Sequence, residues 1–75
     1  MKYECYAPLL DRAAAVEIEY PRYGPREAAE EFAASVWTAV DGFESLLVEV
    51  KGHGSWNVEM CAMPVFTARK VKVKP

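Results

Sequence analysis

The chain has 75 residues, 52% of them hydrophobic, and a formal net charge of −2 at pH 7. This length predicts a single domain, residues 1–75, near the lower limit for folding without staples, and the apolar content excludes intrinsic disorder. The net charge is too small to identify a partner, but residues 1–44 carry nine acids and four bases, whereas residues 45–75 carry two acids and five bases.

Two strands are predicted before the longest helical segment. Residues 2–7 alternate between an apolar and a polar face until Pro8, and residues 9–12 form a turn or hairpin connection. Residues 14–20 alternate most clearly. One face carries Ala14, Val16, Ile18 and Tyr20, and the other carries Ala15, Glu17 and Glu19. Pro21 ends this strand and opens a stiff loop.

One long helix is predicted over about residues 25–43. Pro25 suits the first helical position, Gly24 precedes it as a cap, and Asp41-Gly42 offers a left-handed residue to end it. At about 100° per residue, one arc is apolar: Ala28, Ala29, Phe32, Val36, Ala39, Val40 and Phe43. The opposite arc is polar and acidic. We therefore expect the helix to cover an apolar sheet.

Three strands are predicted after the helix, over residues 46–51, 55–63 and 65–73. A three-residue turn, Gly52-His53-Gly54, joins the first two and pairs Val50 with Trp56, because inward residues must oppose inward residues when one face is buried. The alternation of the last strand is imperfect. A bulge near Arg69-Lys70 would reconcile it, and the alternative is that the strand frays.

The resulting order, β-β-α-β-β-β, predicts an α+β fold. We expect a two-layer sandwich in which one antiparallel sheet of four to five strands carries the single helix on one face.

The sequence predicts a cytoplasmic protein that does not cross a membrane. The start, MKYECY, lacks the apolar run of a signal peptide, and no segment reaches the roughly 18 apolar residues that span a bilayer. Cys5 and Cys61 form no C-x-x-C motif, and we interpret both as free thiols. A disulfide between Cys5 and Cys61 remains an alternative if the two lie on neighbouring strands.

No catalytic, metal or cofactor site is predicted. His53 lies between two glycines, where we expect an exposed turn residue. With Cys5 and Cys61 it makes only three ligands, whereas zinc needs about four. Met60 and Met63 give Cys61 an apolar setting that raises the pKa of a thiol and lowers its reactivity. Glycine-rich phosphate loops are also lacking. We therefore predict no enzyme activity.

Two acidic surfaces are candidates for binding a protein partner. The first is the sheet face away from the helix, where we place Glu17, Glu19, Glu49 and Glu59. The second is the helix surface with Glu27, Glu30 and Glu31, which resembles the charge of a nucleic acid and could occupy an arginine-lined groove. Plain solvation is the alternative for each, and the sheet face could also pair two copies as a homodimer.

The basic C-terminal segment is the alternative site, for nucleic acid. It carries Arg69, Lys70, Lys72 and Lys74. Lysines also protect edge strands against aggregation, and we favour that interpretation because the aromatic residues cluster away from this segment.

The runs VEIEYP, PREAAEEFAASVWTAVDGFE, SLLVEV and SWNVEM follow one another in an organisation that resembles small bacteriophage and mobile-element accessory proteins, compact anti-CRISPR proteins among them. The resemblance covers most of the chain but includes no motif that would transfer a functional residue. It implies a cofactor-free inhibitor in the host cytoplasm that binds a host protein or ribonucleoprotein complex and blocks nucleic-acid access. A nucleic-acid-binding module and a structural or homodimeric phage protein are the alternatives.

Overall fold

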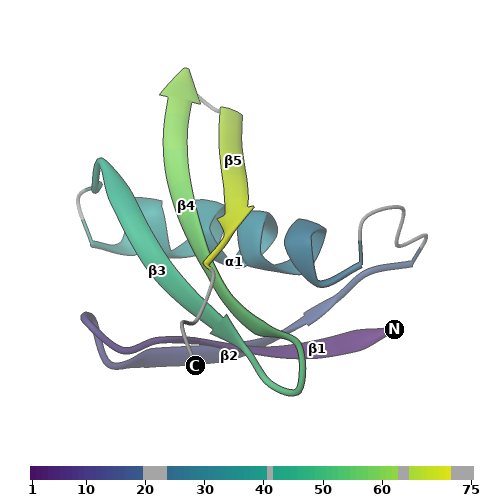
Figure 1. The fold of residues 1–75 in the computed structure, drawn as a ribbon. Coiled ribbons are helices and arrows are strands. Elements are labelled where there is room, and N and C mark those ends of the chain that lie inside the picture. The colour runs from purple at the N-terminus through teal and green to yellow at the C-terminus, as the bar shows by residue number, and fades with distance from the viewer. Residues whose placement is uncertain (20–23, 41, 63–64, 72–75) are drawn as a thin grey trace.

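The computed structural model describes residues 1–19, 24–40, 42–62 and 65–71, without the side chains of residues 61 and 62. Over these residues the chain forms one antiparallel five-stranded sheet with a helix packed on one face, which confirms the predicted α+β fold and the order β-β-α-β-β-β (Figure 1). The elements are β1 (Lys2–Ala7), β2 (Arg12–Glu17), α1 (Pro25–Ala39), β3 (Ser45–Val50), β4 (Gly54–Ala62) and β5 (Val65–Lys70). Across the sheet the order is β2-β1-β3-β4-β5.

The core lies between α1 and the sheet face that it covers. Strands β1 and β3 bury alternate residues, as their sequences predict: Tyr3, Cys5, Ala7, Leu46, Val48 and Val50. The helix contributes Ala28, Ala29, Phe32, Ala33 and Val36. Three of these helix residues are alanines, so the backbone of α1 can approach the sheet closely. Ile18, Trp56, Val58 and Ala68 complete the buried set.

The helix begins as predicted but ends about four residues earlier. Pro25 occupies its first turn after Gly24, whereas Ala39 is its last residue. The N–H of Gly42 donates to the carbonyl of Trp37 at 2.8 Å, which is the six-to-one bond of a Schellman-type end. Phe43, predicted on the helix, lies beyond it and packs against Phe66 with ring centroids 6.2 Å apart. The predicted stop at Asp41 lies outside the described residues.

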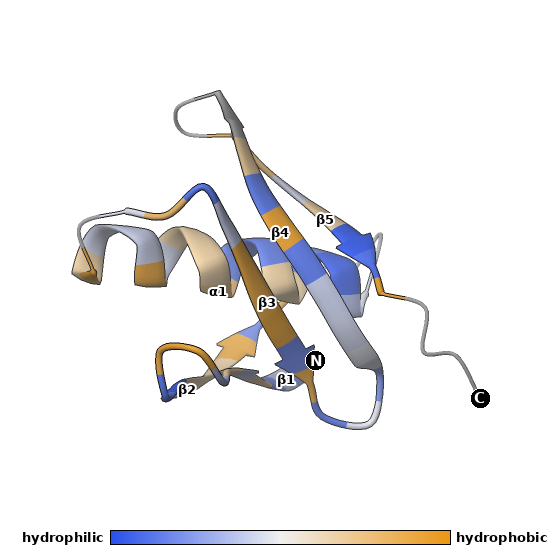
Figure 2. Ribbon diagram, turned by 60° about the vertical axis from the view of Figure 1, so that its left-hand side comes forward, coloured by the Kyte–Doolittle hydropathy of each residue, from blue (hydrophilic) through white to orange (hydrophobic). Residues whose placement is uncertain are grey.

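Strand β2 begins and ends earlier than predicted. The chain reverses over Pro8–Asp11, with Asp11 at a φ of 49°, so that Arg12 already pairs with Ala7. Ile18 lies past the end of β2, yet it is buried and exchanges two hydrogen bonds with Met1, at 2.8 and 2.7 Å. Tyr20 lies outside the described residues. In Figure 2 the apolar turn between β1 and β2 lies at the surface of the molecule.

The β3–β4 hairpin has the predicted faces but not the predicted register. Val50 pairs with Gly54 and Val48 with Trp56, a shift of two residues, so the pairing of Val50 with Trp56 was wrong. The reason is a tight turn in which the N–H of His53 donates to the carbonyl of Val50 at 2.9 Å. Gly52 supplies the positive φ, 79°, and Gly54 joins the ladder.

The bulge lies in β4 rather than near Arg69-Lys70. The register between β4 and β5 shifts between Met60 and Ala62, and it is regular from Phe66 to Lys70. Val71 still donates to the carbonyl of Ser55 at 2.9 Å. The change of face predicted in the last strand therefore does not come from a bulge within Phe66–Lys70, and Val73 lies outside the described residues.

The sheet consists of two ladders, β2–β1 and β3–β4–β5, which meet at a narrow junction between β1 and β3. Strands β1 and β3 pair only at Cys5↔Val50 and Tyr6↔Glu49, with one further bond from the Lys51 N–H to the Glu4 carbonyl at 2.9 Å. The sheet twists strongly here, so that β1 and β2 run at a steep angle to β4 and β5 (Figure 1). Helix α1 contacts all five strands and so joins the two ladders.

None of the helices in the described part of the chain is long and apolar enough to span a membrane.

Replacement of Gly42 by alanine should destabilise the fold more than replacement of Gly52. Both have positive φ, but a Cβ at Gly42 would lie 3.2 Å from the Trp37 ring, whereas a Cβ at Gly52 meets nothing within 4 Å. Chemical denaturation should show Gly42→Ala losing about 1–3 kcal/mol more than Gly52→Ala, the usual cost of overpacking. Equal losses would mean that the Trp37 contact contributes nothing.

Candidate protein-binding surfaces

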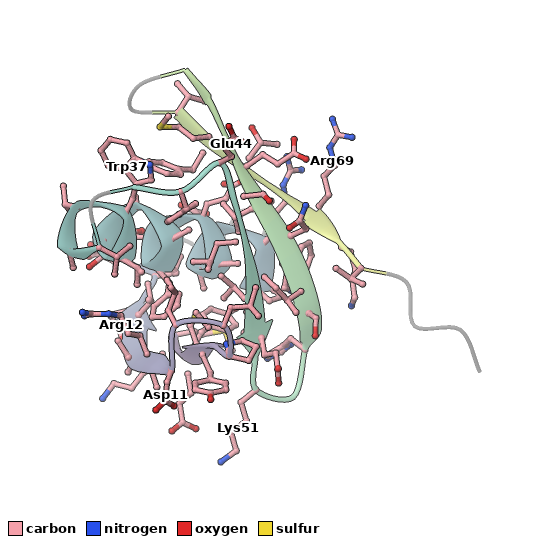
Figure 3. All side chains as sticks on the ribbon, turned by 90° about the vertical axis from the view of Figure 1, so that its left-hand side faces the viewer. Asp11, Arg12, Trp37, Glu44, Lys51 and Arg69 are labelled. Atoms are coloured by element: carbon pink, nitrogen blue, oxygen red, sulfur yellow. The ribbon has the colours of Figure 1, made fainter. Side chains whose placement is uncertain are left out.

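The sheet face away from α1 carries a mixture of charges. In Figure 3 Arg69 projects from this face while Trp37 lies on the helix side. Alternation along the strands places four carboxylates here: Glu4, Glu17, Glu49 and Glu59. It also places Lys2 and Arg69 here, with Lys51 at the end of β3. The face is therefore more balanced than the four predicted carboxylates indicated.

The structure separates the acids predicted on this face. Glu17 lies in β2, where its carboxylate is 3.4 Å from the N-terminal amine, and Glu59 lies in β4 opposite Ser45. Strands β1 and β3 lie between these two strands. Glu19 lies in a bend past the end of β2, so its predicted place on the sheet face was wrong. Strand β2 ends at Glu17 because its partner strand β1 begins at Lys2.

A hollow of about 320 Å³ opens on this face at the junction of the two ladders. It forms where β1 and β3 diverge, beside the small side chain of Ala13. Its lining residues are Glu4, Cys5, Tyr6, Ala13, Glu49 and Lys51. Of the residues predicted to bind a partner, only Glu49 lies in it.

Tyr6 presents an aromatic surface at this hollow. It is 37% exposed, it pairs across the junction with Glu49, and its hydroxyl donates to Asp11 Oδ1 at 3.1 Å. The hydrogen bond to Asp11 raises the pKa of Tyr6, with smaller contributions from desolvation and from the charges of Asp11 and Glu49. The phenol therefore stays neutral at physiological pH, close enough to Asp11 and Glu49 to be affected by their charges.

The charge of the hollow is negative. Glu4 pairs with Lys51 at 3.5 Å, but both side chains are exposed and such pairs are weak. Within the described residues no ion pair neutralises Glu49. The sequence placed Glu4 and Tyr6 outward in their strand, but without the strand order it gave no sign that they lie beside Glu49.

The helix acids do not form one free surface. Glu30 accepts a hydrogen bond from the backbone N–H of Ala68 at 2.8 Å and lies 3.4 Å from Arg26. Glu30 therefore joins α1 to β5. This structural role conflicts with the partner-binding role that the sequence predicted for Glu30. Glu27 and Glu31 remain beside it around a shallow hollow that reaches Phe66.

The basic residues do not gather either. Arg69 and Lys70 are neighbours in β5 and so face opposite sides of the sheet. Lys70 Nζ donates to the carbonyl of His53 at 3.0 Å and lies 5.4 Å from the centre of the Trp56 ring. Lys70 therefore fastens β5 to the hairpin tip. Lys72 and Lys74 lie outside the described residues.

The residues with potential for chemistry are dispersed. Cys5 is a free, buried thiol whose burial raises its pKa to about 11. Strand β3 separates the strands of Cys5 and Cys61, so the neighbouring-strand condition for a disulfide is not met. His53 is exposed, as predicted, but its ring packs edge-on against Tyr3 at 5.3 Å. The described residues contain no group of three potential metal ligands.

Comparison with protein-family models, with curated proteins and with solved structures finds no match for this chain.

Removal of the Glu30 carboxylate should destabilise the protein. Glu30→Ala leaves the Ala68 N–H without its acceptor and should lower the free energy of unfolding by about 1–3 kcal/mol. Glu31→Ala is the matched control because its side chain is exposed on the same helix. Denaturant unfolding of both variants tests this, and equal losses would contradict it.

Cys5 should be unreactive in the folded protein. With a pKa near 11, the thiol holds its proton at pH 8, and burial restricts access to it. In a Cys61→Ser variant, labelling by Ellman's reagent should be slow until denaturant is added. The thiol's stabilising contribution is complete below pH 9 and is lost as pH rises towards 11, so Cys5→Ala should flatten the fall in stability over that range. Fast labelling of the native protein would contradict both expectations.

Proposed function

We propose that the protein is a small, non-enzymatic inhibitor that binds a basic surface of a host macromolecular complex through its open sheet face. The observation that supports this most is the hollow at the β1–β3 junction, where Glu4, Glu49 and the exposed ring of Tyr6 meet. Because the order of elements resembles that of compact anti-CRISPR proteins, we propose that this complex is a CRISPR–Cas complex.

The chemistry of the hollow fits an arginine or lysine side chain of the partner. A guanidinium can pair with a carboxylate through two parallel hydrogen bonds and can also lie over an aromatic face. Glu49 and Tyr6 offer these two groups at paired positions of neighbouring strands. The Glu4–Lys51 pair at the rim is weak enough to open when a second cation arrives.

A preference for arginine and lysine side chains is consistent with inhibition by competition with nucleic acid. Complexes that hold nucleic acid line their grooves with arginine and lysine, which contact phosphates. A protein that presents carboxylates to such a groove competes with the nucleic acid without chemistry of its own. Glu17 and Glu59 lie towards the two sides of the same face and extend the contact beyond the hollow.

Charge reversal at Glu49 should abolish inhibition. The chain is expressed in bacteria whose CRISPR–Cas systems of different types target a test phage, and plaquing efficiency is measured. The unmodified chain should restore plaquing in at least one host, and Glu49→Lys should reduce this by at least about tenfold, the equivalent of 1.4 kcal/mol of binding. Glu31→Lys makes the same charge change on the outer side of α1 and should have no effect.

Two results would overturn the proposal. One is inhibition of none of the systems, and the other is full activity of Glu49→Lys. A host-independent measurement accompanies them: an arginine-rich peptide added during NMR titration should shift the amides of Glu4, Tyr6 and Glu49. Gel-shift titration over a salt series tests the nucleic-acid alternative, for which steep salt dependence is the signature.

A further inference from the structure

The residues that line the hollow at the β1–β3 junction carry unbalanced charges. Glu4 and Glu49 contribute two negative charges and Lys51 contributes one positive charge. Lys51 Nζ lies 3.5 Å from Glu4, whereas no ion pair within the described residues involves Glu49. One added cation therefore balances the lining. The hollow has a volume of about 320 Å³, at the lower end of the roughly 300–1,000 Å³ of small-ligand pockets, so it has room for a single side chain.

Glu49 is the carboxylate best placed to receive this cation. Its neighbours on the two adjacent strands are Tyr6 in β1 and Ser55 in β4, and neither carries a charge. Glu4, by contrast, lies opposite Lys51, whose N–H donates to the Glu4 carbonyl at 2.9 Å. Side chains directly opposite each other have Cβ atoms about 4.5–5.5 Å apart, so a group that pairs with Glu49 also reaches Tyr6.

Tyr6 offers such a group its ring rather than its hydroxyl hydrogen. The hydroxyl already donates to Asp11 Oδ1 at 3.1 Å, while 37% of the residue is exposed. On the other side of Tyr6, β2 places only the methyl group of Ala13 opposite it. The ring is therefore accessible from the same hollow as the Glu49 carboxylate.

A carboxylate beside an accessible ring distinguishes arginine from lysine. An ammonium gains from Glu49 only an exposed ion pair, which is weak. A guanidinium pairs with a carboxylate through two parallel hydrogen bonds, and it is less strongly hydrated than an ammonium. It also lies over aromatic rings more often than an ammonium does. The pair of Glu49 and Tyr6 therefore favours a guanidinium.

We infer that the hollow selects arginine over lysine, and that Tyr6 is the residue that determines this specificity. The inference rests on the proposed function, because it takes the hollow as the place where the partner binds. It adds the identity of the side chain that the partner supplies: one arginine that projects from a protein surface.

NMR titration with two blocked tripeptides, Gly-Arg-Gly and Gly-Lys-Gly, tests the inference, because each peptide carries one cation. Both should shift the amides of Glu4, Tyr6 and Glu49. The arginine peptide should bind about two- to fivefold more tightly, which is the range expected for a cation over an exposed ring.

Two variants of Tyr6 separate the ring from the hydroxyl. Tyr6→Leu removes the ring and should bring the affinities of the two peptides together. Tyr6→Phe keeps the ring but not the hydrogen bond to Asp11, and should retain the preference for arginine. Tyr6 does not belong to the buried core, so both variants should fold, and their NMR spectra verify this.

Lys51→Met is the control for charge. It removes the positive charge that competes for Glu4, and the side chain is exposed and extends from the surface (Figure 3). Both peptides lose the same competitor, so both affinities should rise by the same factor while the preference for arginine stays unchanged.

The outcomes that overturn the inference differ from those that overturn the proposed function. Equal affinity of the two peptides, or a preference that survives Tyr6→Leu, would remove the inference and leave cation binding by the hollow intact. Failure of both peptides to shift the amides of the hollow would remove both. A chain that prefers arginine but inhibits no CRISPR–Cas system would confirm the specificity and contradict the proposed function alone.

Discussion

The packing of α1 across the junction between two ladders is the constraint on which the rest of the structure depends. Strands β1 and β3 pair at only two positions, Cys5↔Val50 and Tyr6↔Glu49, so backbone bonding alone joins the halves of the sheet weakly. The alanines of α1 let the helix lie close enough to contact every strand. The Cys5 thiol even reaches the carbonyl of Ala28, at 3.8 Å. The helix therefore joins two halves of the sheet that share few backbone bonds.

This packing makes the molecule one-sided. The helix covers one sheet face, and through Glu30 it also satisfies the β5 edge. The opposite face and the β2 edge receive no such cover from the described elements. The divergence of the ladders, which the helix tolerates, opens the hollow beside Tyr6 and Glu49. The hollow that we propose for partner contact thus follows from the same junction that the helix must span.

The sequence predicted what depends on local periodicity. Alternation along β1, β3 and β4 gave the buried face, and the proline and apolar arc gave the helix start and its inner surface. Register and strand order could not be predicted from local periodicity, because they depend on pairing between residues far apart in the sequence. Gly52 and Gly54 fit two hairpin registers of the same parity, and only the turn geometry decides between them.

The candidate site was predictable only in part for the same reason. Glu49 was identified from its place on an exposed face, but its neighbours Glu4 and Tyr6 come from a strand more than forty residues earlier. Glu30 was predicted to bind a partner or to be solvated, and Lys70 to contact nucleic acid or to protect an edge strand. In the structure both make tertiary hydrogen bonds to backbone groups. A charge pattern in sequence does not distinguish a free carboxylate from one that satisfies a strand edge.

Amide hydrogen exchange, resolved by residue in dilute protein, tests the one-sided architecture most directly. Met1 and Ile18 exchange both backbone bonds, so the amides of Ala14 and Val16 bond to β1 and those of Ala13, Ala15 and Glu17 point away from it. The account therefore predicts fast exchange at Ala13, Ala15 and Glu17, and slow exchange at Ala14 and Val16. It also predicts slow exchange at Ala68, whose N–H bonds to Glu30 on the opposite edge. Protection of Ala13, Ala15 and Glu17 at high dilution, or fast exchange at Ala68, would contradict it.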